Sequence, residues 1–396
     1  MAQIFSAVAG LLIARWLSVD DYALYTIIIT IMGAISVLTK GGAHLGFAAI
    51  IGRHWPDMGR VAAAISAVRV ARRILSWIVL PPLLVAAGFL FSRQGADIIT
   101  IIYLTILLIL FWITDMQSRV IDQVLFFSKQ TTRIQLVDTV LGLGRLGAVL
   151  CLFYLHLLST VSASATGVIL AAFRVWPITT WIKELAPTQA LALQEDVEEI
   201  RAVTIRQLPA ELFYVFQSQL VLATLTMFGQ PINLAGFGAL TRIPQLLLPV
   251  QSYCYAFCVP IFSSRQREVA PVLLMLTALC SAPGLVLIAV ALIFPSWLLF
   301  FIGPNYSSLD HQLLVCATTA AIAHSSGIAW NLVAHRGWNK WVWVQIPVGF
   351  VWCGLAPIFL DLGSIEGALW FQCGFSGGLI IATLLDLFDA YQRGDL

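Results

Sequence analysis

Three arginines lie near the middle of stretches that are otherwise apolar enough to span a bilayer: Arg145, Arg174 and Arg242. A permanent cation at the bilayer centre costs roughly 2.5 to 3.5 kcal/mol on insertion scales, so it persists only beside water, an opposite charge or an anionic ligand. Arg174 and Arg242 have no acidic residue nearby in their own predicted helices, which favours open polar space over a private ion pair. We therefore expect these arginines, with the further buried cations Arg119 and Lys40, to line a cationic substrate cavity.

Acidic residues in the same stretches are candidates for gating or ion coupling. Asp138 precedes Arg145 by two helical turns on one face, so both side chains are expected to point into the same space. An internal ion pair between them is the alternative. Asp115 lies one turn before Arg119, where a solvated ion-pair face is the alternative to a coupling role. Glu211, near the start of a predicted span, is the third candidate, and its shallow position favours the alternative of exposure at the membrane interface.

A pair of glycines interrupts the second apolar stretch. Gly41 and Gly42 lie between Lys40 and His44, which predicts a broken helix with a cation at the break. Such a cation is typical of a substrate contact or a hinge, and equally of a lysine reaching the membrane surface. Further along the chain, His324 is interpreted as an interior histidine with a hydrogen-bond partner rather than a proton relay.

The composition determines the class of protein. Of 396 residues, 60% are hydrophobic and 11% are charged, and the mean hydropathy is +0.90. A soluble chain of this length would be roughly a quarter charged, and a transmembrane barrel would show alternation instead of long apolar runs. The sequence therefore predicts an all-α polytopic membrane protein with about twelve transmembrane helices. The expected spans are 2–17, 22–39 with an extension towards 52, 61–91, 98–127, 134–156, 162–184, 208–228, 233–258, 270–301, 313–334, 342–360 and 366–388.

The distribution of lysine and arginine predicts the orientation. With both termini in the cytoplasm, most of these residues flank the spans on the cytoplasmic side, as the positive-inside rule requires. Only Arg15 and Arg93 fall on the outer side, where the turns are short and acidic. The predicted cytoplasmic cations are Arg53, Arg60, Arg69, Arg72, Arg73, Lys129, Arg133, Lys183, Arg201, Arg206, Arg265, Arg267, Arg336, Lys340 and Arg393.

A polar segment divides the chain. Residues 186–207 are predicted to form a cytoplasmic linker between an amino-terminal six-helix lobe, 1–185, and a carboxy-terminal six-helix lobe, 208–396. Because six is even, both lobes enter the membrane in the same orientation, as in transporters built from parallel repeats. We expect the lobes to be related by a pseudo-two-fold axis along the membrane normal.

Soluble catalytic motifs are missing from the sequence. It contains no GxxxxGK[ST] loop and no HExxH motif, and its seven cysteines fall in predicted spans, where they behave as small hydrophobic residues. The GLGRLG run at 142–147 matches a dinucleotide fingerprint only in letters, because it lies inside a predicted membrane span. We expect no catalytic residues, no metal site and no bound cofactor, and coupling to H⁺ or Na⁺ is left open.

Five short motifs together resemble the Wzx-type polysaccharide or O-antigen flippases of the multidrug/oligosaccharidyl-lipid/polysaccharide (MOP) exporter superfamily. The resemblance covers nearly the whole chain. Two departures are an alanine, Ala23, in place of the usual glycine, and a chain that begins within the first helix without the amphipathic lead-in. The motifs are 14–18 (ARWLS, with Asp21 and Tyr22 following), 259–263 (VPIFS), 303–306 (GPNY), 333–337 (VAHRG) and 363–368 (GSIEGA).

The resemblance implies a non-enzymatic membrane transporter. Such a flippase moves a polyprenyl-pyrophosphate-linked oligosaccharide from the cytoplasmic to the periplasmic leaflet of the bacterial inner membrane, by alternating access through a central cationic cavity. The product would serve O-antigen, capsule or exopolysaccharide biosynthesis. Other membrane proteins of polysaccharide assembly are candidate partners, and no nucleic-acid partner is expected.

Three other functions are compatible with parts of the sequence. A MATE-like drug or organic-cation antiporter would share the fold, although its pocket should be acidic and aromatic. A membrane glycan polymerase or ligase would need an extracytoplasmic reaction site, which the short outer turns do not easily provide. A non-transporting scaffold of a glycan-assembly complex is the third alternative.

Overall fold

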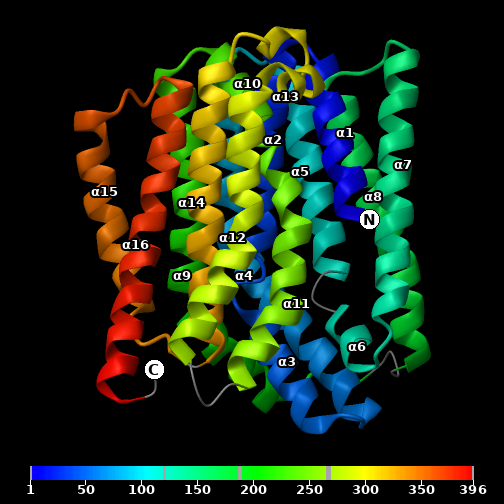
Figure 1. Ribbon diagram of the computed structural model, residues 1–396. Coiled ribbons are helices and arrows are strands. Elements are labelled where there is room, and N and C mark those ends of the chain that lie inside the picture. Colours follow the sequence, from blue (N-terminus) through cyan, green and yellow to red (C-terminus); the bar gives the residue numbers. More distant parts are fainter. Residues whose placement is uncertain (1, 119–121, 186–189, 265–268, 337, 395–396) are drawn as a thin grey trace. The chain divides into compact units, whose positions relative to one another are not determined.

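The computed structural model describes residues 2–118, 122–185, 190–264, 269–336 and 338–394, and these residues form helices joined by short turns (Figure 1). Within these ranges, ten helices are long and apolar enough to cross a membrane. The other expected spans correspond to the shorter apolar helix α1 and to an interrupted segment, 231–264. The predicted all-α polytopic membrane fold is therefore confirmed.

The helices of the first half follow the apolar runs closely. The Asp57 side chain caps α4, because its carboxylate accepts the backbone N–H groups of Gly59 and Arg60. The helix then continues through Pro81 and Pro82. The bounds are α1 (Ala2–Trp16), α2 (Val19–Leu38), α3 (Ala43–His54), α4 (Met58–Arg93), α5 (Ile98–Ser118), α6 (Asp122–Phe127), α7 (Thr131–Tyr154) and α8 (Thr160–Leu185).

The second expected span ends at the predicted break. Gly41 and Gly42 have φ values of +46° and +82°, which glycine adopts without the strain of a side chain. A Cβ atom on Gly41 would also clash with the Leu75 side chain, and one on Gly42 would lie 2.5 Å from Gln207 Cβ. The prediction of a broken helix at this position is confirmed, and α3 is a separate helix rather than an extension of α2.

Prolines divide two of the expected spans in the second half. Pro244 and Pro295 lack the N–H that would continue the preceding helix, so each begins a new helical segment. The bounds are α9 (Gln194–Phe228), α10 (Pro231–Leu240), η1 (Pro244–Leu247), α11 (Leu248–Ser264), α12 (Val269–Ile293), α13 (Pro295–Ile302), η2 (Pro304–Tyr306), α14 (Asp310–His335), η3 (Val342–Val344), α15 (Gln345–Phe359) and α16 (Ile365–Gln392).

Helix α9 begins inside the expected linker and has no break at residue 208. Its polar first turns are held by ion pairs, with Arg53 bonded to Glu199 and Arg60 bonded to both Glu195 and Asp196. The polar residues that suggested a linker therefore form the outer part of a long helix. The four residues 186–189 of the expected linker lie outside the described part of the chain.

The chain forms two compact units. The first comprises Met1–Ala9 with Asp20–Gln219, and the second comprises Gly10–Val19 with Leu220–Leu396. The first twelve residues after 207 thus belong to the first unit, where Gln219 donates to the Thr30 carbonyl. In the second unit, Arg15 lies over the Phe300 ring and donates to the Phe300 carbonyl.

Each unit has an apolar core of its own. The first unit's core includes Phe47 and Ile50 of α3 with Val61 of α4, and it extends to residues of α6, α8 and α9. The second unit's core includes Phe262 of α11, Leu273 of α12 and Ile328 of α14. Many large apolar side chains on the outer helix faces stay exposed in the protein alone, which is the pattern expected where lipid supplies the remaining contacts.

Candidate functional site

Arg174 is the centre of a buried ion-pair cluster in the first unit. It lies on α8 and is 5% exposed. Its guanidinium donates two bonds to Asp122 of α6, at 3.2 and 2.8 Å, and its Nε donates to Asp138 Oδ1 of α7 at 2.7 Å. The expectation that Arg174 lacks an acidic partner and faces open polar space was wrong. Its partners come from other helices, which a search along its own helix could not find.

Asp138 and Arg145 do not form the pair that their spacing suggested. Asp138 bonds to Arg174, whereas Arg145 Nη2 donates to the Tyr25 hydroxyl at 2.9 Å. Tyr25 is fully buried on α2, and Arg145 is partly buried on α7. Among the described residues, no carboxylate forms an ion pair with Arg145, and its buried Nε has no hydrogen-bond partner. Arg145 is thus a cation within a membrane-spanning helix whose identified partner is neutral.

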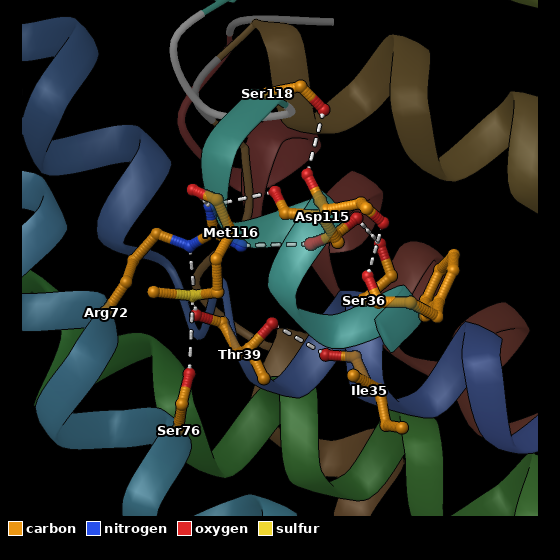
Figure 2. Close-up of polar contacts among 10 residues, drawn as sticks. Ile35, Ser36, Thr39, Arg72, Ser76, Asp115, Met116 and Ser118 are labelled. Atoms are coloured by element: carbon orange, nitrogen blue, oxygen red, sulfur yellow. Dashed lines mark hydrogen bonds and ion pairs between the residues drawn. The ribbon is translucent and has the colours of Figure 1, made fainter. Parts of the chain in front are cut away.

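A second buried ion pair joins α4 to α5 (Figure 2). Arg72 Nη2 donates to Asp115 Oδ2 at 3.0 Å, and Ser36 of α2 donates to the other carboxylate oxygen at 3.0 Å. Arg72 also donates to the backbone carbonyls of Thr39 and Met116. Both charged side chains are almost completely buried, and the neighbouring donors and acceptors satisfy them. Asp115, a coupling candidate, therefore has a fixed structural partner.

Arg72 was expected from the sequence to be a cytoplasmic flanking cation, but it forms a buried ion pair instead. It is 1% exposed, at the level of the break between α2 and α3, where it bonds to the last residue before Lys40. The signal that could have found it was Asp115 itself. A carboxylate inside a long apolar run needs a cation from another helix.

Lys40 and Glu211 are near enough to each other to interact electrostatically. Lys40 lies in the turn that Gly41 and Gly42 close, and Glu211 of α9 lies close enough for electrostatic attraction between the two side chains. His44, at the start of α3, is near Lys40 and Arg72. Lys40, at the predicted break, therefore lies near both a carboxylate, Glu211, and a second cation, Arg72. Glu211 is half-buried on α9.

Arg242 lies in the second unit, at the interruption between α10 and η1. Its Cδ is 3.7 Å from the position that a Cβ on Gly10 of α1 would occupy. The arginine is partly buried, and its backbone N–H bonds to the Ala239 carbonyl in the turn before Pro244. The fifth predicted cavity cation, Arg119, lies outside the described residues.

The second unit contains a cavity of about 300 Å³ beside this interruption. Segments of η1, α11, α14 and α16 form its walls. Its polar lining residues are Thr241, Gln251, Thr319, His324 and Gln372. His324 is buried and bonds through Nε2 to the Cys280 carbonyl at 3.0 Å, which confirms the interpretation of an interior histidine with a partner.

No known protein-family model matches the chain, and no curated protein is similar enough in sequence to count as a relative. Solved structures do match over nearly the whole chain. A multidrug resistance MATE family transporter of the MOP superfamily, in an inward-facing conformation, has 12% identity and a TM-score of 0.77 over 99% of this chain and 94% of its own.

Two further structures extend the comparison. The MATE multidrug transporter DinF-BH has 16% identity and a TM-score of 0.66 over 99% of this chain and 92% of its own. The lipid II flippase MurJ, in an inward closed conformation, has 12% identity and a TM-score of 0.63 over 98% of this chain and 86% of its own. The chain therefore has the helical membrane fold that MATE transporters of the MOP superfamily share with MurJ.

Proposed function

We propose that the protein is a flippase that carries a polyprenyl-pyrophosphate-linked oligosaccharide across the bacterial inner membrane for surface polysaccharide synthesis. Both termini would lie in the cytoplasm, as the lysine and arginine distribution predicts. The fold shared with the lipid II flippase MurJ supports a transporter of a lipid-linked substrate. In this proposal the chain catalyses no covalent reaction.

The observation that carries the proposal is the state of Arg145. A guanidinium inside a membrane-spanning helix costs several kcal/mol unless a counterion or water compensates it. Its identified partner, the Tyr25 hydroxyl, is neutral, and its Nε is buried and unsatisfied within the described part of the chain. An arriving pyrophosphate oxygen would supply both the charge and the acceptor, because guanidinium groups bind such oxygens with two parallel hydrogen bonds.

The other predicted cations have different places in this proposal. Arg174 is already neutralised by two carboxylates, so we assign it to the architecture that holds α7 beside α8. Arg242 and Lys40 stay candidates for contacts with the headgroup, as does Arg119. Asp138, whose side chain is 34% exposed, is the carboxylate best placed to exchange partners during transport.

The membrane potential can drive the proposed movement of the substrate between leaflets. Moving about two negative charges out of a cell that is negative inside is downhill by roughly 2.3 kcal/mol per charge per 100 mV. The cycle therefore needs no ATP site, and proton or sodium coupling would add to this term. In the proposed cycle, Arg145 is exposed in turn to the two sides of the membrane.

A reconstituted assay tests the role of Arg145. Liposomes that contain the protein and a fluorescent polyprenyl-pyrophosphate disaccharide are treated with an impermeant quencher, which reports movement between leaflets. We expect Arg145→Ala to slow transfer at least tenfold, Arg145→Lys to slow it less, and Tyr25→Phe to leave most of it. Equal transfer by wild type and Arg145→Ala would contradict the proposal.

A MATE-like organic-cation antiporter is the second candidate, and one observation favours it. Among the described residues, the Arg174 cluster contains one cation and two carboxylates, and the partly exposed Asp138 is the carboxylate that a proton or an organic cation could neutralise. The MATE comparison supports the same function. Proton-driven uptake of ethidium into the same liposomes, lost in Asp138→Asn, would favour the antiporter over the flippase.

A further inference from the structure

The cavity in the second unit is small and lies inside one compact unit. Its volume of about 300 Å³ is near the lower end of the range for ligand sites, roughly 300 to 1,000 Å³. On one wall, Ala320 and Ala323 of α14 have short side chains that do not fill the space. On another wall, Pro244 begins the 3-10 helix η1. Interrupted helices line substrate sites in many transporters, because irregular backbone at membrane depth is tolerated where protein buries it or where it lines a water-filled cavity.

The lining combines uncharged polar side chains with a larger number of apolar ones. Thr241, Gln251, Thr319, His324 and Gln372 supply the hydrogen-bonding side chains, and the remaining lining residues are apolar, proline or cysteine. In the part of the chain that the structure describes, no carboxylate, ammonium or guanidinium group lines this cavity. An ionic ligand would lose its hydration here without gaining a counterion, and that loss is expensive in a low-dielectric site.

The existing hydrogen bonds determine what the cavity offers a ligand. The Thr319 hydroxyl donates to the Cys316 carbonyl at 3.1 Å, and the Thr241 hydroxyl donates to the Phe237 carbonyl at 2.9 Å. Since each hydroxyl has one proton, both oxygens are left as acceptors. His324 bonds to the Cys280 carbonyl through Nε2, so that nitrogen carries a proton, and Nδ1 is the ring nitrogen left for a ligand.

An acceptor-rich, uncharged cavity selects a ligand that brings its own donors. Phosphate and carboxylate ions bring only acceptors, and an organic cation lacks a counterion here. A sugar ring brings several hydroxyl donors and no charge, and the Gln372 amide can pair with its ring and hydroxyl oxygens. We propose that this cavity binds one uncharged sugar unit, and thus recognises the glycan part of the substrate. The inference rests on the proposed flippase function for its physiological meaning.

Direct binding of free sugars tests the inference without any transport assay. The wild-type protein in nanodiscs is mixed with glucose, galactose or N-acetylglucosamine at millimolar concentrations, and saturation-transfer NMR detects bound sugar. We expect a signal from at least one sugar, weakened at least fivefold by Thr319→Val, which removes an acceptor, and by Ala323→Leu, which fills the space. Inorganic pyrophosphate and tetraethylammonium at the same concentration should not displace the sugar.

Thr318→Val is the matched control for Thr319→Val. Thr318 neighbours Thr319 on α14, and its hydroxyl also donates to a backbone carbonyl, that of Leu314 at 2.8 Å, but it does not line the cavity. Both valine variants therefore lose one intrahelical bond, and only one should lose sugar binding. Equal loss in the two, displacement by tetraethylammonium, or no signal from any sugar overturns the inference.

The two proposals fail separately. Sugar binding that depends on Thr319, together with no leaflet transfer in liposomes, would remove the flippase function and leave the cavity's ligand class in place. Leaflet transfer that depends on Arg145, without sugar binding in the nanodiscs, would remove the cavity's role and leave the flippase function in place.

Discussion

The buried ion pairs of the first unit and the cavity of the second unit solve the problem of polar groups inside a membrane in different ways. The first unit buries full charges, in the pair Arg72 with Asp115 and in the cluster of Arg174 with two carboxylates. The second unit's cavity is lined by hydroxyl, amide and imidazole groups. Charges in a low dielectric must be matched by opposite charge, whereas neutral groups need only hydrogen bonds. The first unit is therefore suited to ions, and the second unit's cavity is suited to uncharged hydroxyl groups.

Arg145 differs from Arg72 and Arg174, the two buried arginines described in the first unit, and this difference makes the comparison informative. Arg72 and Arg174 each donate hydrogen bonds to a carboxylate, whereas Arg145 donates to a tyrosine hydroxyl. Fully paired arginines are expected to support structure, because breaking them leaves an uncompensated buried charge. An anionic ligand would stabilise a cation whose partner is neutral more than a cation that is already paired with a carboxylate. The predictions below separate these roles by their energetic size.

The largest effect is expected at the Arg72 and Asp115 pair. Asp115→Leu should lower the free energy of unfolding by about 3 to 5 kcal/mol, because it leaves a buried guanidinium without its counterion. The double variant Arg72→Met with Asp115→Leu should lose much less, since no charge is left behind. Chemical unfolding in detergent micelles measures both. A double variant as unstable as the single one would show that the packing, and not the charge balance, dominates.

The two acidic residues of the Arg174 cluster should contribute unequally to the free energy of unfolding. Each carboxylate receives two hydrogen bonds from Arg174. Those to Asp122 are 3.2 and 2.8 Å long and its side chain is 10% exposed, whereas those to Asp138 are 2.7 and 3.5 Å long and its side chain is 34% exposed. We expect Asp122→Asn to cost about 2 to 3 kcal/mol of stability and Asp138→Asn about 1 kcal/mol, since a partly hydrated carboxylate is easier to neutralise. The same unfolding measurement applies. The reverse order would assign the structural role to Asp138.

Tyr25→Phe isolates the contact of Arg145. It removes the hydroxyl that accepts from the guanidinium and leaves the buried ring of this α2 residue in place. We therefore expect the free energy of unfolding to fall by about 1 kcal/mol, the net contribution of one hydrogen bond. Thermal melting followed by tryptophan fluorescence detects a change of this size. A loss comparable to that of Asp115→Leu would mean that Arg145 is as firmly built into the structure as Arg72.

The smallest effect is expected in the cavity of the second unit. Thr241→Val removes a hydroxyl whose proton is used within its own helix, so the free energy of unfolding should fall by about 0.5 to 1 kcal/mol. No buried charge is released by this change. A loss above the value for Asp138→Asn would break the contrast between the two units, because it would give a neutral group the structural weight of a charged one.

The sequence was sufficient to predict properties that depend on neighbours along the chain. Apolar runs predicted the membrane helices, and adjacent glycines predicted the break after Lys40. The partners of the buried arginines could not be predicted in this way. Asp122 and Asp138 lie 52 and 36 residues from Arg174, and helix packing decides which of them it meets. The seven-residue spacing of Asp138 and Arg145 placed both on one face but did not identify the partner that each would find.

The buried arginines and their acids are also close in the order of synthesis. Arg72 and Asp115 lie on α4 and α5, and Arg174 and Asp138 lie on α8 and α7, so these two pairs join consecutive helices, whereas Asp122 comes from α6, one helix earlier. A nascent helical hairpin can therefore carry its arginine and its counterion into the bilayer together, and the charge need never face lipid alone. The order of the helices along the chain thus eases the biogenesis of the charged unit as well as its final stability.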